Sequence, residues 1–308
     1  GLASLMVAIG LSILAAFGFA TSAILARQGM QSVFPLPGVL VSLFVSFVLS
    51  SAMVLAFAFD DIGNIPQEAV FWILGLGVIT FLGGRTQNFL AANLIGASRS
   101  SLFIASQAPF AAIFAVAFIG ETIHPLVALG TAGVVGGLLF STGESIMAGW
   151  RTDKVFILGY LMALAAGASY GATNVMAKQV IEIYDSPLMV TAFSMLIGLF
   201  VLAPLVGASA ARTGVLRAGH RSLGQTLHSL RFVAMAGLAS GIAVNALYFA
   251  VQKADVVVIS PIVASSPLVT LLLAHIFLAR LETVTRKLVA GTLMAVLGVV
   301  LVVVGSQL

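Results

Sequence analysis

The chain has 308 residues, of which 60% are hydrophobic and only 8% are charged, and its formal net charge is +4. Soluble domains carry charge on about a quarter of their residues, so this composition excludes a soluble globular protein and a disordered chain. The basic residues are spread over long intervals and form no phosphate-binding patch, which argues against nucleic acid as a partner. The absence of cysteine excludes disulfides, thiolate metal sites and cysteine nucleophiles.

Ten apolar segments lie between the charged residues, and each approaches the length of a helix that crosses a bilayer. The third is the least apolar, because Arg85, Gln87 and Asn88 fall inside it. The loops leave no room for a soluble domain, so the sequence predicts an all-α membrane protein with ten transmembrane helices. We expect these helices at about residues 2–25, 37–59, 69–94, 101–119, 125–142, 155–177, 186–207, 231–250, 256–279 and 287–306.

The basic residues are distributed unequally between the two sides of this arrangement. Of the 14 Lys and Arg residues, eleven fall in the odd-numbered loops and two in the even-numbered loops, while Arg85 lies inside a segment. Loops rich in Lys and Arg stay in the cytoplasm. The charge count therefore predicts cytoplasmic odd-numbered loops and places both termini outside the cytoplasm.

The two halves of the chain share short sequence matches at slowly increasing offsets. Residues 26–28 recur at 177–179, an offset of 151. Gly84 and Asn88 recur as Gly241 and Asn245, an offset of 157, and Glu121-Thr122, Gly130 and Gly137 recur at an offset of 161. The pattern indicates a duplicated unit covering residues 1–150 and 151–308. Because each unit contains five spans, the second enters the bilayer inverted, which is typical of transporters.

Motifs along the whole chain carry a family resemblance. They include residues 17–28 and 169–179, the Ala105–Pro109 run with Gly120-Glu121-Thr122, and the Ala264–Pro267 run with Glu282-Thr283. With these motifs the chain resembles the drug/metabolite transporter superfamily in its ten-span EamA-type branch, and most of all the YddG-type bacterial amino-acid exporters. The resemblance implies export of small metabolites, with amino acids as the expected class, across a bacterial inner membrane.

Two features depart from that family pattern. The spacing from Pro267 to Glu282 is 15 residues, whereas that from Pro109 to Glu121 is 12. Members of the branch often keep their termini in the cytoplasm, which conflicts with the charge count.

Arg85 is the formal charge that lies clearly within a predicted span. Its guanidinium can bind a substrate carboxylate through two parallel hydrogen bonds. It can instead reach the membrane interface, or cap backbone carbonyls within the bundle. The preceding Gly83 and Gly84 permit close helix approach or local unwinding, so we expect a hinge there.

Other polar residues within the spans are candidates to line a central cavity, since uncompensated polar groups are costly in lipid. The alternative for the amides is hydrogen bonding between helices, and for the tyrosine of segment 8 plain packing. Two prolines are candidate kinks, because proline frees a backbone carbonyl upstream. The predicted substrate contacts beside Arg85 are Asn88, Gln107, Tyr170, Asn174, Asn245 and Tyr248, and the predicted kinks are Pro109 and Pro267.

None of the ten acidic residues falls in the middle of a span, which argues against a proton-coupled pump for cationic drugs. Hydrolase and metalloprotease motifs are absent, so we expect no enzyme activity, metal or cofactor. An intramembrane enzyme, or a carrier for sugars or nucleosides, remains the alternative. The expected partners are a small-molecule substrate and membrane lipid, and the sequence leaves the oligomeric state open.

Overall fold

A computed structural model describes the chain except residues 1, 64, 120–123, 153, 214–222, 254–261, 264 and 306–308. The described residues form helices joined by short connections and contain no strand. Long apolar runs fold as helices in a membrane because lipid offers no partners for backbone N–H and C=O groups. The predicted all-α membrane fold is confirmed.

The first half begins with two long helices, continues through three consecutive helical pieces and a broken pair, and ends with a long helix. Residues 67–95 form one continuous span from α3 to α4, whereas α5 and α6 are separated at Ala105 and Ser106. The elements are α1 (Leu2–Gly29), α2 (Pro35–Phe57), the 3-10 helix η1 (Phe59–Gly63), α3 (Gln67–Gly77), the π-helix η2 (Val78–Thr86), α4 (Gln87–Ile95), α5 (Ala97–Ile104), α6 (Gln107–Ile119) and α7 (Pro125–Thr152).

The described part of the second half repeats this order of helices. Its elements are α8 (Lys154–Ile183), α9 (Pro187–Thr213), α10 (Leu223–Lys253), α12 (Ser266–Phe277) and α13 (Arg286–Gly305). The first part of the predicted ninth segment lies outside the described residues. α9 and α10 extend beyond the predicted spans at 186–207 and 231–250, since α9 continues to Thr213 and α10 begins at Leu223. Helices can extend beyond the apolar run that crosses the bilayer.

Six helical stretches among the described residues are long and apolar enough to cross a membrane: Ala3–Gly29, Pro35–Phe57, Gln67–Ile95, Lys154–Ile183, Pro187–Ser209 and Leu227–Ala250. Shorter apolar helices cover Pro125–Ser141 and Ser266–Phe277. The protein is therefore a multi-pass membrane protein.

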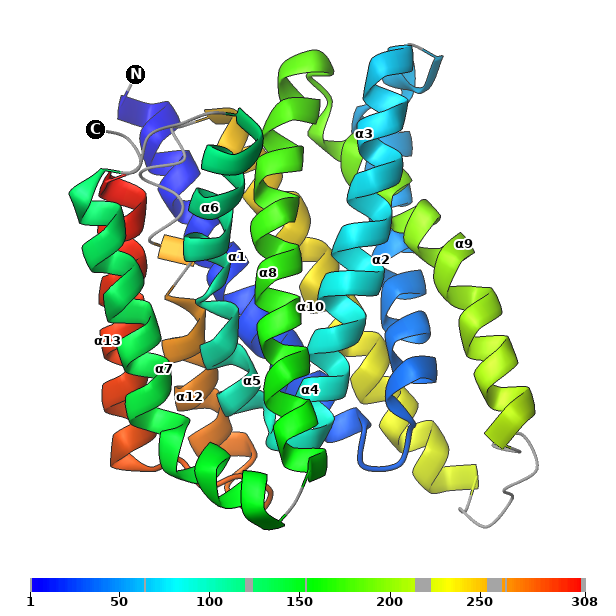
Figure 1. The fold of residues 1–308 in the computed structure, drawn as a ribbon. Helices are drawn as coiled ribbons and strands as arrows, with labels where there is room; N and C mark the ends of the chain where they lie inside the picture. Colours follow the sequence, from blue (N-terminus) through cyan, green and yellow to red (C-terminus); the bar gives the residue numbers. More distant parts are fainter. Residues whose placement is uncertain are drawn as a thin grey trace.

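The helices run alternately up and down, and α1 and α8 run in opposite directions (Figure 1). Both termini lie at the upper end of the view. We call the lower end the basic end, because α1 ends there and α13 begins there, with Arg27, Arg99, Arg280 and Arg286 at or between the helix ends. The opposite direction of corresponding helices is the arrangement that inverted repeats require.

Repeat-related glycines meet where α7 packs along α13. A Cβ added at Gly130 would lie 2.5 Å from the carbonyl oxygen of Gly298, and one added at Gly291 would lie 2.5 Å from that of Gly137. Gly130 thus faces Gly298, the repeat counterpart of Gly137, and Gly137 faces Gly291, the repeat counterpart of Gly130. A two-fold relation between the halves produces this pair of equivalent contacts. Without side chains, the two backbones approach closely.

Candidate functional site

The site is built on η2, the π-helical part of the third span. Thr86 Oγ1 donates to the carbonyl oxygen of Phe81 at 2.8 Å, five residues earlier. Two glycines in this turn bring it against α8: a Cβ at Gly83 would lie 2.5 Å from Ser169 Oγ, and one at Gly84 would lie 2.5 Å from Tyr170 Cε1. The sequence predicted close helix approach or local unwinding at these glycines. The structure shows the close approach to α8, and the local change of the helix is a π-helical turn. π-helical turns are frequent at functional sites.

Arg85 points into the protein from this turn and is only 5% exposed. Its Nη2 donates to Ser42 Oγ at 2.7 Å and to Ser46 Oγ at 3.1 Å. The two serines lie one turn apart on α2, so the guanidinium joins η2 to α2. The interpretation of Arg85 as a residue that reaches the membrane interface is wrong, because its head group is buried between helices.

Among the described residues, no carboxylate neutralises the charge of Arg85. Within the part of the chain that the structure describes, its hydrogen bonds go to neutral hydroxyls, and Nε and Nη1 have no acceptor. A buried charge without a counter-ion is costly. An anion brought against the free N–H groups would relieve that cost.

Tyr170 and Asn88 lie beside Arg85. The Tyr170 ring covers Gly84, and its hydroxyl interacts with the Asn88 side chain and with the Arg85 charge. Asn88 Oδ1 also accepts a hydrogen bond from Ser100 Oγ at 2.6 Å. Of the predicted substrate contacts, the structure thus brings Arg85, Asn88 and Tyr170 together, on η2, α4 and α8.

Asn245 joins this group through a row of serines. It is 2% exposed, and its Nδ2 donates to Ser50 Oγ and to the Gly241 carbonyl oxygen, both at 2.8 Å. Ser50 lies one turn beyond Ser46 on α2. Asn245 therefore makes the interhelical hydrogen bond that was the alternative to substrate contact, although its Oδ1 is buried without a partner.

The other predicted contacts make no hydrogen bond to Arg85 in the described part of the chain. Gln107 is half-buried at the start of α6, where its carbonyl faces Gly171 of α8. Asn174 is exposed one turn beyond Tyr170. Tyr248 packs in an apolar cluster with Val54, Val180 and Tyr184.

The two prolines predicted as kinks stand at helix starts. Pro109 lies in the first turn of α6, directly after the break at Ala105 and Ser106, and Pro267 is the second residue of α12. The first turn of a helix accepts proline because its N–H groups have no helical partner. The span containing Pro109 is thus interrupted just before the proline.

Sequence reasoning missed the serines of α2. Ser42, Ser46 and Ser50 are each 0% exposed, and together they connect Arg85 to Asn245. Their signal was a four-residue spacing of hydroxyls on one face of an otherwise apolar span. Such a row indicates a polar face turned towards other helices.

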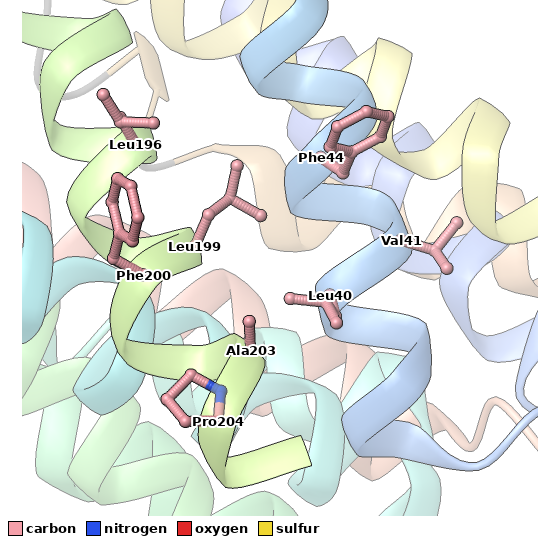
Figure 2. Close-up of a pocket in the computed structure, with 8 residues that line it drawn as sticks. All are labelled: Leu40, Val41, Phe44, Leu196, Leu199, Phe200, Ala203 and Pro204. Carbon is pink, nitrogen blue, oxygen red and sulfur yellow. The ribbon is translucent and has the colours of Figure 1, made fainter. Parts of the chain in front are cut away.

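A groove of about 510 Å³ between α2 and α9 is apolar throughout (Figure 2). Its eight lining residues include Phe44 and Phe200, which are 56% and 73% exposed. None of the predicted substrate contacts lines it. This surface therefore faces lipid and is separate from the polar site.

Comparison with known proteins identifies the class. The model of the EamA-like transporter family matches the chain twice, over residues 6–143 and 157–304. The chain belongs to this family, which is part of the drug/metabolite transporter superfamily, and it is a membrane transporter of small molecules. No curated protein matches the sequence.

The fold also occurs among solved structures. One, titled only as the crystal structure of a protein, is 19% identical, with a TM-score of 0.62 over 96% of this chain and 94% of that chain. At this identity the similarity shows the fold alone.

Proposed function

We propose that this transporter exports small metabolites that carry a carboxylate, with amino acids as the first class, and that Arg85 binds the carboxylate. The observation that carries the proposal is the buried guanidinium whose Nη2 is held by Ser42 and Ser46. The fixed Nη2 orients the remaining N–H groups for a planar, bidentate acceptor. The charge-assisted bonds would offset the cost of burying the cation.

Asn88 and Tyr170 would contact the rest of the substrate. An amide offers donors and acceptors, and a phenol offers a hydroxyl and an aromatic face. An ammonium group can lie over that face, since cations are attracted by aromatic rings. We assign these roles to Asn88 and Tyr170 because both lie beside Arg85.

Transport would proceed by alternating access, in which the two halves rock around a central site. The opposite direction of α1 and α8 and the glycine contacts between α7 and α13 support this motion. We further propose that the basic end faces the cytoplasm of a bacterial inner membrane, because basic residues stay on that side. Both termini then lie outside the cytoplasm.

The test is uptake of radiolabelled amino acids into proteoliposomes by the wild type, Arg85→Gln and Arg99→Gln. Arg99 is the matched control, since its Nη1 donates to the carbonyl oxygen of Ile95 on the neighbouring turn and, among the described residues, to no other group. We expect saturable uptake that Arg85→Gln lowers at least tenfold at low substrate concentration and that Arg99→Gln leaves unchanged. Uptake by Arg85→Gln at the wild-type rate and with the wild-type KM would overturn the site, and absence of amino-acid uptake would overturn the substrate class in favour of sugars or nucleosides.

A further inference from the structure

At the basic end, the side chain of Glu282 ties the second half of the chain to the first. Its Oε1 accepts a hydrogen bond from the Ala97 N–H at 2.5 Å, and its Oε2 accepts one from the Ser98 N–H at 3.0 Å. These N–H groups open α5 and have no partner within the helix, and a carboxylate is favoured there by the helix dipole. Glu282 follows α12, so it caps a helix of the other repeat.

Gly96 makes room for this cap. Its φ is +91°, a backbone conformation that favours glycine. A Cβ at this position would lie 2.8 Å from Glu282 Cδ. Both the turn and the space for the carboxylate therefore depend on glycine at position 96.

Arg27, at the end of α1, adds a weaker contact. Its Nε lies 3.6 Å from Glu282 Oε1, which is an ion pair but longer than a hydrogen bond, and Nε has no hydrogen-bond partner among the described residues. Its Nη1 donates to the Asn93 carbonyl oxygen at 3.1 Å. The pair is thus held by charge at a distance from which it can separate without breaking a short hydrogen bond.

An apolar layer connects the same three helices at this end. It consists of Ile24 of α1, Ala97 of α5, Ala274 of α12 and Leu278 just after it, each 4% exposed or less. Ser100, which bonds Asn88 of the substrate site, is only two residues beyond Ser98. The layer and the Glu282 contacts therefore lie between the substrate site and the basic end.

We propose that Glu282, Arg27 and the start of α5 form a latch that closes the transporter at its basic end. The apolar layer closes the route of the substrate from its site to the basic end, and Glu282 holds the two halves of the chain together at this layer. For the site to open at this end, Glu282 has to leave both the α5 N–H groups and Arg27. The latch rests on the proposed alternating access, but it does not depend on the identity of the substrate.

The absence of cysteine allows a direct test with single-cysteine reporters. Ser101 is half-buried and donates to Thr270 Oγ1 of α12 at 3.1 Å, so Ser101→Cys reports separation of α5 from α12. Val180→Cys, at a 0% exposed position of α8 in another apolar cluster, reports general unfolding. Each reporter is labelled in membrane vesicles by a membrane-impermeant maleimide applied from either side.

Three variants break the latch in different ways. Arg27→Gln removes the ion pair and keeps the cap, Glu282→Gln removes the charge from both, and Gly96→Ala displaces the carboxylate. We expect Glu282→Gln and Gly96→Ala to raise labelling at Ser101→Cys from the basic end about tenfold, the shift that loss of one charge-assisted hydrogen bond produces. Arg27→Gln, which removes only the longer ion pair, is expected to raise it by a smaller factor. Arg286→Gln, which removes an exposed charge at the start of α13 at the same end, is the control and is expected to label at the wild-type rate.

Two results would overturn the proposal. One is wild-type labelling at Ser101→Cys in both Arg27→Gln and Glu282→Gln. The other is a parallel rise at Val180→Cys, which shows that the contacts only stabilise the fold. If Glu282→Gln does not accumulate in the membrane, Arg27→Gln and Gly96→Ala decide the outcome. Because labelling needs no substrate, failure of the amino-acid assay leaves this test unaffected.

Discussion

The third span and α10 occupy equivalent positions in the two repeats but differ at the residue to which we assign substrate binding. Arg85 and Ile242 are separated by the same 157 residues as Asn88 and Asn245. Arg85 is 5% exposed and bonded to α2, whereas Ile242 is 43% exposed on a regular helix. The two repeats therefore share one helix arrangement, but at this position only the first repeat places a charged side chain inside the protein.

The π-helix accounts for the different orientation. Each residue of an α-helix turns the chain by about 100°, so a turn that holds one extra residue rotates all following side chains by about that angle. Residues 78–86 are π-helical, whereas residues 241–245 continue the α-helix of α10. A distortion confined to one repeat can thus convert a lipid-facing position into an internal one.

The largest expected effect comes from changing the charge at this position. Arg85→Gln should lower transport at low substrate concentration at least tenfold, because a hydrogen bond to a charged group contributes about 1.5–3 kcal/mol. Arg85→Lys keeps the charge but loses the bidentate geometry, so its transport rate should lie between those of the wild type and Arg85→Gln. Ile242→Ala should leave the KM unchanged, and a higher KM in Ile242→Ala would contradict the comparison.

The paired glycines give the next effect. In Gly84→Ala the new Cβ falls 2.5 Å from the Tyr170 ring, whereas in Gly241→Ala the nearest atom is the flexible end of Leu49 at 3.1 Å. Overpacking costs about 1–3 kcal/mol, so Gly84→Ala should raise the KM several-fold and lower the unfolding temperature. Gly241→Ala should change both the KM and the unfolding temperature less than Gly84→Ala does. Equal KM values for the two variants would show that Tyr170 does not contact substrate.

The paired asparagines should separate binding from stability. Asn245→Ala removes two buried hydrogen bonds, so it should cost about 1 kcal/mol of stability at unchanged KM. Asn88→Ala should raise the KM with a smaller change in stability, because Asn88 lies beside Arg85 and Tyr170. Thermal unfolding in detergent and uptake kinetics measure the two quantities, and a reversed pattern would exchange the roles of the residues.

The smallest expected effect is a pH dependence of stability that arises from Tyr184, at the end opposite the basic end. Burial raises the pKa of Tyr184 above its ordinary value of 10.0; the Ser186 hydroxyl opposes this increase, and the Asp61 charge adds to it. The folded state therefore holds the proton more tightly, so the stabilisation is present below pH 10 and is lost as the pH rises towards the pKa of the folded state. The Tyr184 hydroxyl donates to the Asp61 carbonyl oxygen at 2.9 Å.

Tyr184→Phe should lower the unfolding temperature at neutral pH and remove part of its decline above pH 10. Unfolding temperatures measured from pH 8 to 11 test this expectation. An unchanged alkaline decline in Tyr184→Phe would assign the decline to other groups.

Much of the fold could be predicted from hydropathy and repeats, because lipid forces long apolar runs into helices. The site could be predicted only in part. Arg85, Asn88 and Tyr170 stood out as polar residues in apolar spans, but the direction in which Arg85 points depends on a π-helix that the sequence does not specify. Tyr248 and Asn245 stood out in the sequence for the same reason as Asn88, as polar residues in an apolar span. Only the structure shows that Tyr248 lies in an apolar cluster and that Asn245 donates to Ser50.

The most direct test of the central role of Arg85 compares a transported amino acid with its carboxyl amide in competition assays on the wild type and Arg85→Gln. The wild type should prefer the free carboxylate by at least about tenfold, which corresponds to about 1.4 kcal/mol. Arg85→Gln should compete equally well with both compounds, because the charge that recognises the carboxylate is gone. A preference for the carboxylate that survives in Arg85→Gln would place the binding group elsewhere and contradict the account.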